Sequence, residues 1–320
     1  MQWAGIKAVI VCENVALLAC LLSPLNFLVM SAPLIILRHT LRLLAVLPLP
    51  IVHLIGLALG WIVYVASPNS ARLLRENLRR SGIAANRKDF RRILYRNIGE
   101  SGKALLETFS IWQKPLEKVL TWVQSCNGWE HVESALAKGK GIIFLTPHLG
   151  CFEITSLYYA AQQPITVLYR PPKQKWLQPL IEAGRQRGKA SLAPATGQGV
   201  RDLLLALRRG EAVGILPDQI PYQGEGEWAD YFGRPAYTMT LASRLAEKTG
   251  AAVIMAFGER LPFGRGYHIH LTPLAEGSIN TVAGLNAAIE SKVRQCPEQY
   301  LWSYHRHKVR KGTKSTNRAI

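Results

Sequence analysis

The chain carries the stretch GIIFLTPHLGCFE at residues 141–153, an apolar run that ends in a histidine and a glutamate five positions apart. On a continuous helix, side chains five residues apart point roughly 140° apart, because each residue turns the helix by about 100°. The two groups can meet only if a helix starts between them, and Gly150 permits such a break. We therefore predict a strand over the apolar run, a turn that holds His148, and a helix that starts near Cys151 with Glu153 in its first turn.

His148 and Glu153 are the residue types of a general base and of the carboxylate that orients it. A neutral imidazole can take a proton from a hydroxyl near pH 7, and a carboxylate can hold the tautomer and stabilise the charged ring. A histidine at a strand end can equally be a hydrogen-bonded core residue, and the helix dipole alone favours a glutamate in a first helical turn. The pair therefore indicates a proton-transfer site only if the rest of the chain agrees.

Apolar, strand-like runs alternate with helix-like stretches through the middle of the chain. The predicted strands are 141–146, 164–169, 212–216, 251–257 and 267–272, and the predicted helices are 131–139, 151–161, 174–187, 199–209 and 238–249. This alternation predicts an α/β fold with a mostly parallel central sheet flanked by helices, and ligands near the carboxyl ends of the strands. His148, Arg170 and Asp218 each follow a predicted strand, so we expect these side chains to converge on one crevice.

Two long apolar stretches precede this region. Residues 15–37 contain no charged residue, and about 20 apolar residues suffice to span a bilayer. Residues 44–66 are also uncharged if His53 is neutral, but two prolines interrupt them. Two spans in a hairpin would place basic residues on both sides of the membrane, which the positive-inside rule disfavours. We therefore predict one spanning helix near 15–37 and an interfacial or re-entrant helix near 44–66, with Trp61 and Tyr64 at the lipid headgroups.

The net charge is strongly positive and unevenly distributed. Lys and Arg total 39 against 21 Asp and Glu, which gives +18. Residues 69–103 hold ten basic and three acidic side chains, and residues 305–320 hold six basic and none acidic. Such patches attract nucleic acid, anionic lipid, phosphorylated glycolipid or an acidic carrier protein. No nucleic-acid-binding motif is present, and the first patch directly follows an apolar stretch, which favours an anionic membrane surface.

Five sequence blocks, in the same order, resemble the bacterial lipid A lauroyl/myristoyl acyltransferases, a branch of the glycerolipid and lysophospholipid acyltransferase superfamily. The blocks are TPHLGCFE at 146–153, YRPPK at 169–173, GEAVGILPDQ at 210–219, YFGRPAYT at 231–238 and PEQYLWSYHR at 297–306. The likeness covers roughly residues 41–310. The sequence ADYFG at 229–233 departs from the apolar-Pro-Phe-Phe-Gly run that this family often has.

The resemblance implies a membrane-bound acyltransferase with the catalytic domain on the cytoplasmic side of a bacterial inner membrane. It implies acyl carrier protein as the donor and a hydroxyl of a Kdo-bearing lipid A precursor as the acceptor, with no metal and no other cofactor. We accordingly divide the chain into membrane-anchoring helices at 1–66, an acyltransferase domain at 67–305 and a basic, disordered tail at 306–320.

The predicted catalytic residues are His148 as general base and Glu153 as its orienter. The predicted substrate-binding residues are Arg170, Asp218, Gln219, Gly233, Arg234 and Pro235. Arg170 supplies a fixed cation suited to a phosphate or a developing oxyanion. Asp218 could orient Arg170, bind a sugar hydroxyl or cap a turn.

Three alternatives stay open. The acceptor could be a lysophospholipid, a glycolipid or a phosphatidylinositol mannoside, although relatives that acylate glycerophosphates usually carry aspartate at the position of Glu153. Cys151 could carry the acyl group as a thioester, whereas the resemblance implies direct transfer. The chain could also be a basic membrane scaffold or nucleic-acid-binding protein without activity. The five cysteines are odd in number and lack paired spacing, so neither a disulfide framework nor a cysteine metal site is expected.

Overall fold

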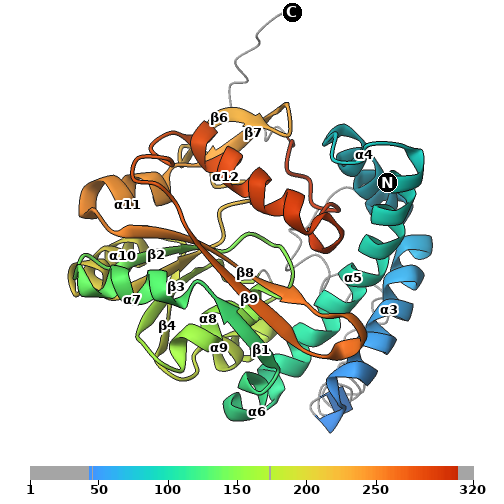
Figure 1. Cartoon of the computed structure of the whole chain (residues 1–320), viewed down its shortest axis with the longest axis horizontal. Coiled ribbons are helices and arrows are strands. Elements are labelled where there is room, and N and C mark those ends of the chain that lie inside the picture. Colours follow the sequence, from blue (N-terminus) through green and yellow to red (C-terminus); the bar gives the residue numbers. More distant parts are fainter. Residues whose placement is uncertain (1–42, 45, 173, 309–320) are drawn as a thin grey trace, which may run out of the picture.

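The central sheet of the protein contains seven strands, with helices on both faces (Figure 1). The computed structural model describes residues 43–44, 46–172 and 174–308. The sheet strands are β1 (Val123–Asn127), β2 (Ile142–Leu145), β3 (Ile165–Tyr169), β4 (Ala190–Pro194), β5 (Ala212–Ile215), β8 (Ala252–Arg260) and β9 (Tyr267–Pro273). Their order is β1-β9-β8-β2-β5-β3-β4. Strands β8, β2, β5, β3 and β4 run parallel, while β9 lies antiparallel to β8 and parallel to β1.

An antiparallel hairpin and the helices surround this sheet. The hairpin consists of β6 (Gly226–Tyr231) and β7 (Arg234–Met239). The helices are α3 (Leu49–Ala66), α4 (Pro68–Arg80), α5 (Arg87–Gln113), α6 (Leu116–Leu120), α7 (Trp129–Ala137), α8 (Phe152–Ala160), α9 (Gln178–Arg185), α10 (Gly197–Arg208), α11 (Leu241–Thr249) and α12 (Val282–Gln295). Short 3-10 turns occur at η1 (Lys175–Leu177), η2 (Pro262–Gly264) and η3 (Pro297–Gln299).

Strand β2 illustrates how the sheet is covered on both faces. All four of its side chains are buried. Ile142 and Phe144 pack in one core with residues of α7, α8 and α9, whereas Ile143 and Leu145 pack in a second core with residues of α10, α11 and α12. Side chains alternate across a strand, so an uninterrupted apolar run is typical of a strand that is covered on both sides.

The predicted α/β region is confirmed, with element ends that differ by a few residues. The mostly parallel sheet flanked by helices is present, and each of the five predicted strands belongs to it. The sequence did not predict β1, β4 or the β6–β7 hairpin. Strands β1 and β4 have the sequences VQSCN and ASLAP, in which Val123 is the one β-branched residue and no aromatic residue occurs, so the usual strand signal is weak.

The structure describes part of each end of the chain that flanks the predicted domain. The predicted spanning helix at 15–37 lies outside the described residues, whereas the helix predicted near 44–66 corresponds to α3. Within the described part of the chain, α3 is the one helix long and apolar enough to cross a membrane, and 28% of it is buried. Arg306 is buried and donates to Tyr237 and Thr238, so the packed structure extends past the predicted boundary at residue 305.

Helix α3 packs against α5 at one edge of the molecule (Figure 1), and glycines on both helices allow their backbones to approach closely. A Cβ on Gly102 of α5 would lie 2.0 Å from the carbonyl oxygen of Gly56 in α3. A Cβ on Gly60 of α3 would lie 2.1 Å from the carbonyl oxygen of Ile98 in α5. Only glycine fits at these positions, because the obstacle is backbone and not the end of a flexible side chain.

A buried ionic network also joins α3 and α5 to the sheet. Arg260 of β8 donates to both carboxylate oxygens of Glu107, and His53 of α3 lies 3.0 Å from the same carboxylate. Tyr267 of β9 donates to it at 2.9 Å. Burial by itself would raise the pKa of Glu107, but the charge and hydrogen bonds of Arg260, with those of His53, hold that pKa well below its ordinary value. Removing Arg260 would leave the buried carboxylate of Glu107 without its main charged partner.

The glycine contact gives a direct test of α3 docking. We expect Gly102→Ala to lower the apparent melting temperature of the detergent-solubilised protein by roughly 5 °C, equivalent to about 2 kcal/mol, because the backbone of α3 must move. Gly99→Ala on the same helix is the matched control, since its Cβ would meet only the Leu57 side chain at 3.4 Å. Equal melting temperatures for the two variants would contradict the close backbone contact.

Candidate active site

His148 lies in a turn that leaves the carboxyl end of β2 and packs against β8. Gly150 in this turn has a φ of +60°, and a Cβ there would lie 2.1 Å from the carbonyl oxygen of Gly258. The backbone N–H of Cys151 donates to the same oxygen at 2.7 Å, and α8 then begins at Phe152. The predicted strand, turn and helix start are thus confirmed, and glycine at position 150 allows the close approach to β8.

Both ring nitrogens of His148 have a side-chain partner. Nδ1 lies 2.8 Å from Oδ1 of Asp218, and Oδ2 of the same carboxylate accepts the backbone N–H of His148 at 2.9 Å. Nε2 lies 3.1 Å from the side-chain nitrogen of Gln219. His148 and Asp218 are 6% and 2% exposed. Strands β2 and β5 are adjacent and parallel, so the residues that follow them meet at one edge of the sheet.

The Asp218 carboxylate determines which nitrogen of His148 carries the proton. An ionised carboxylate only accepts hydrogen bonds, so Nδ1 is protonated and Nε2 keeps the lone pair that the Gln219 amide approaches. Burial by itself would raise the pKa of Asp218, but the charge and the hydrogen bonds of His148 outweigh burial and lower this pKa. The pair therefore stabilises the fold above the ordinary pKa of aspartate, and the contribution is lost as the pH falls through the lowered value.

Glu153 is paired with Arg185 of α9, which differs from the predicted contact with His148. Nε of Arg185 donates to both carboxylate oxygens at 3.0 Å, and its Nη2 also donates to Oε1. Among the described residues, the carboxylate at the His148 ring is that of Asp218. Glu153 lies in the first turn of α8 beside α9, whereas Asp218 follows the strand next to β2. Orienting Arg170 was one of three roles considered for Asp218, and in the structure its carboxylate contacts His148.

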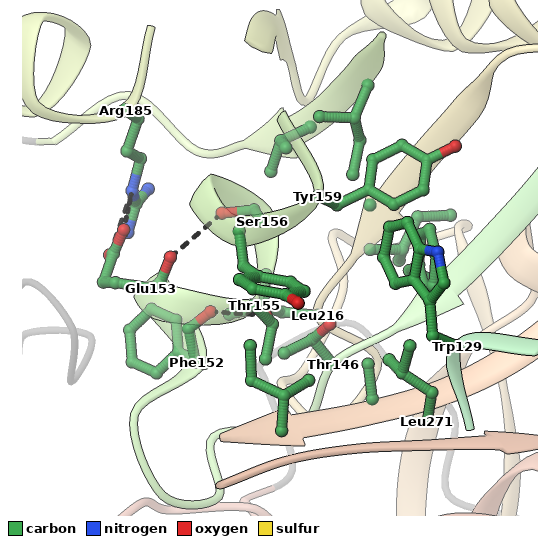
Figure 2. Close-up of a pocket in the computed structure, with 18 residues that line it drawn as sticks. Trp129, Thr146, Phe152, Glu153, Thr155, Ser156, Tyr159, Arg185, Leu216 and Leu271 are labelled. Carbon is green, nitrogen blue, oxygen red and sulfur yellow. Dashed lines mark hydrogen bonds and ion pairs between the residues drawn. The ribbon is translucent and has the colours of Figure 1, made fainter. Parts of the chain in front are cut away.

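An apolar pocket begins beside this ion pair. Figure 2 shows Glu153 and Arg185 at one end of it and Trp129 and Leu271 at the opposite end. The pocket encloses about 660 Å³, counting the open space at its mouth. The lining residues that lie on strands are Phe144, Ile165, Val167, Gly214, Ile215, Ala256, Ile269 and Leu271. A long apolar space with charged groups at one end suits a hydrocarbon chain that carries a polar head.

The pocket adjoins the imidazole of His148. Phe152 lines the pocket, and its ring centroid lies 5.0 Å from that of His148. Thr146, two residues before His148, also lines it. The end of the pocket that holds the Glu153–Arg185 pair therefore lies beside the candidate base.

The other predicted site residues lie farther from the imidazole. Arg170 follows β3, and its guanidinium donates to the carbonyl oxygen of Ile220 at 3.4 Å and lies 4.6 Å from the ring of Tyr222. It therefore contacts the loop after Gln219 and is separated from His148 by that loop.

Gly233, Arg234 and Pro235 belong to the β6–β7 hairpin. Arg234 donates to the Asn77 side chain at 3.2 Å, and the carbonyl oxygen of Pro235 lies 3.1 Å from Nδ1 of His307. The structure therefore brings Asp218 and Gln219 to His148, whereas Arg234 lines a different hollow and Gly233 and Pro235 line neither.

Arg185 is the functional candidate that the sequence did not reveal. It lies in the last turn of α9, 32 residues after Glu153, in a helix with no motif around it. No local pattern distinguishes it from the other arginines of this basic chain, because its role depends on a carboxylate from another helix.

Cys151 is buried, at 3% exposure, and burial raises the pKa of its thiol well above the ordinary value. The thiolate is the nucleophilic form of cysteine. This environment disfavours the alternative in which Cys151 carries the acyl group.

Comparisons with known proteins agree with these features. The family model described as bacterial lipid A biosynthesis acyltransferase matches residues 29–309. The lipid A biosynthesis lauroyltransferase of Escherichia coli is 26% identical over 273 residues, covering 82% of this chain and 87% of the relative. The lipid A biosynthesis palmitoleoyltransferase of Escherichia coli is 26% identical with the same coverage. A phosphatidylinositol mannoside acyltransferase of Mycobacterium tuberculosis is 25% identical over 173 residues, covering 52% of this chain and 54% of the relative.

The observed partner of His148 predicts the effect of one substitution. We expect Asp218→Asn to lower kcat for acyl transfer by about 10³-fold or more, because an amide no longer holds the proton on Nδ1. Steady-state kinetics of the purified protein give kcat, and Asp230→Asn on the exposed side of β6 is the control. If Asp218→Asn stayed active while Glu153→Gln lost all turnover, Glu153 would be the orienting carboxylate as the sequence predicted.

Proposed function

The chain belongs to the bacterial lipid A biosynthesis acyltransferase family, and from this premise we propose that it moves a fatty acyl chain from acyl carrier protein to a hydroxyl of a Kdo-bearing lipid A precursor. The observation that carries the proposal is the state of His148. Its Nδ1 faces a buried carboxylate, its Nε2 retains a lone pair, and its ring contacts Phe152, which lines a long apolar pocket. A base and a hydrocarbon site side by side are what acyl transfer to a hydroxyl requires.

In this proposal the acceptor hydroxyl approaches Nε2 of His148 in place of the Gln219 amide. His148 takes the hydroxyl proton while the hydroxyl oxygen attacks the carbonyl carbon of the thioester. The carbon–sulfur bond breaks, and the proton passes from Nε2 to the leaving thiolate. Asp218 stabilises the imidazolium between these two transfers. The reaction balances with acyl carrier protein as co-substrate and needs no cofactor.

The pair of Glu153 and Arg185 has a separate task in this proposal. Hydrogen bonds from both Nε and Nη2 to one carboxylate fix the plane of the guanidinium at the polar end of the pocket. Among the described residues, Nη1 of Arg185 makes no hydrogen bond, so it can donate to the oxygen that becomes negative during attack. Glu153 then acts by positioning Arg185, and Arg170 remains a binding residue for an anionic part of the substrate.

We also propose that α3 lies in the surface of the bacterial inner membrane, with the catalytic domain on the cytoplasmic side. The large apolar side chains that α3 exposes are Ile51, Leu54, Ile55, Leu57, Trp61, Ile62 and Val65. Exposed apolar area of this extent is typical of a lipid or partner contact. The arginine-rich helix α4 follows directly, and its charges favour anionic headgroups. The Tyr64 hydroxyl accepts from Arg75 at 2.7 Å, an arrangement suited to the headgroup level.

A second acceptor class is supported by one comparison. The similarity to a phosphatidylinositol mannoside acyltransferase keeps another glycolipid acceptor as the alternative. The chemistry at His148 is the same in both cases, so the acceptor has to be identified by product analysis.

The transfer reaction can be tested by product mass. Wild-type and His148→Ala membranes are incubated with acyl-carrier-protein thioesters of several lengths and with Kdo-lipid IVA, lysophosphatidic acid and phosphatidylinositol mannoside. We expect one added acyl mass on Kdo-lipid IVA, and a loss of about 10²-fold or more in the variant, because proton removal is lost. The mass also gives the chain length that the pocket accepts.

Two outcomes would change this proposal. Product on phosphatidylinositol mannoside or lysophosphatidic acid alone would keep the mechanism and replace the acceptor. Near-normal activity of the His148→Ala variant would exclude His148 as the base.

The membrane proposal predicts the effect of charge on the exposed face of α3. We expect Leu54→Glu combined with Ile62→Glu to lower binding to anionic phospholipid vesicles by about tenfold or more, because two carboxylates would have to enter the lipid surface. Flotation with vesicles measures the bound fraction. Leu205→Glu on α10, where Leu205 is 48% exposed, is the control. Unchanged flotation of the double variant would exclude α3 as the contact surface.

A further inference from the structure

A second hollow lies between α4, the β6–β7 hairpin and the C-terminal segment. It encloses about 300 Å³, counting the open space at its mouth. Its polar lining comprises Asn77, Arg80, Ser81, Arg234, Arg306 and His307. These residues come from three segments that are far apart in the sequence, so the fold itself gathers the basic side chains.

Arg306 is a buried cation with an unused donor. It is 3% exposed, and it donates to the Tyr237 carbonyl at 2.7 Å and to the Thr238 hydroxyl at 2.6 Å. Its Nε is buried and makes no hydrogen bond among the described residues. Buried guanidinium donors almost always have a partner, so a ligand in the hollow is the expected acceptor.

The cations of the hollow lie close enough to affect one another. The pKa of Arg234 is lowered by burial and by the charge of Arg80. Burial lowers the pKa of His307 to about 4, and the charges of Arg234, Arg306 and Arg80 add to this effect. Oε1 of Glu76 lies 3.2 Å from Nη2 of Arg80, so this carboxylate balances one of the positive charges. The remaining positive charge in a partly enclosed space attracts an anion.

The hollow also adjoins the candidate base. Leu301 lines the hollow, and its backbone N–H donates to the carbonyl oxygen of His148 at 3.1 Å. The Tyr304 hydroxyl, in the same wall, accepts the backbone N–H of Ile220, two residues after Asp218. One chain segment therefore separates the hollow from the residues that hold the imidazole.

We propose that this hollow binds a phosphate group of the glycolipid acceptor, with Arg80, Arg234 and Nε of Arg306 as donors. The inference rests on the proposed acyl transfer for the identity of the acceptor. A phosphate held here anchors the sugar headgroup while a hydroxyl of the same molecule lies at His148. Guanidinium groups suit this task because their donors match the oxygens of a phosphate.

The test measures binding without an acyl donor. The full chain in detergent is titrated with Kdo-lipid IVA, with the same lipid after enzymatic removal of its phosphates, and with inorganic phosphate. The variant carries Arg80→Gln and Arg234→Gln. The matched control carries Arg72→Gln and Arg244→Gln, exposed arginines of α4 and α11 that do not line the hollow.

We expect the Arg80→Gln/Arg234→Gln variant to bind the phosphorylated lipid roughly tenfold or more weakly than wild type, because charge-assisted hydrogen bonds are lost. The control should bind within about twofold of wild type, because an exposed surface charge contributes little binding energy. The dephosphorylated lipid should bind equally to wild type and variant. Inorganic phosphate should bind far more weakly than the lipid.

Four results would overturn the phosphate site. The first is that wild type does not bind the phosphorylated lipid, and the second is that variant and control lose the same affinity. The third is that the variant loses the same affinity for the dephosphorylated lipid as for the phosphorylated one. The fourth is that inorganic phosphate binds as tightly as the lipid. Failure of the proposed acyl transfer can be told apart from failure of the phosphate site. Tight, phosphate-dependent binding without acyl product would support the phosphate site and contradict the acyl transfer. Acyl product together with unchanged lipid binding by the variant would support the acyl transfer and contradict the phosphate site.

Discussion

The buried hydrogen bonds between His148 and Asp218 depend on two neighbouring parallel strands. Strands β2 and β5 are paired in register from Ile142 and Ala212 onward, so the residues after them leave the sheet at the same edge. Asp218 then accepts from both the ring and the backbone of His148. This double contact fixes the tautomer, the ring orientation and the height of the turn above β8 together.

Three tasks are divided among separate parts of the chain. The apolar pocket is built from strand side chains and α8, and its charged end is the Glu153–Arg185 pair. In the proposed function, proton transfer takes place at the strand ends that carry His148. The basic hollow is built from the hairpin, α4 and the C-terminal segment. A reaction between a lipid chain and a charged headgroup needs this separation, because apolar and ionic groups require different surroundings.

Backbone contacts and a buried ionic network together link α3 to the catalytic domain. Close glycine contacts bring α3 onto α5, and the carboxylate of Glu107 joins His53 of α3 to Arg260 of the sheet. A buried charge group of this kind holds one arrangement in place, since any other would leave a charge unpaired. The outward face of α3 stays apolar and exposed, while its inward face is fixed to the same strand, β8, that supports the His148 turn.

The sequence by itself determined strands β2, β3, β5, β8 and β9 with the helices α7 to α11, the break at Gly150 and the position of His148 at a strand end. These features are local, because the apolar period and the glycine act on neighbouring residues. It also indicated Asp218 and Gln219 as site residues without saying what they contact. Only the tertiary structure decided that Asp218 orients His148, that Glu153 pairs with Arg185, and that Arg80, Arg234 and Arg306 meet in one hollow. Those contacts join residues tens to hundreds of positions apart, and side-chain periodicity carries no information about which strand lies beside which.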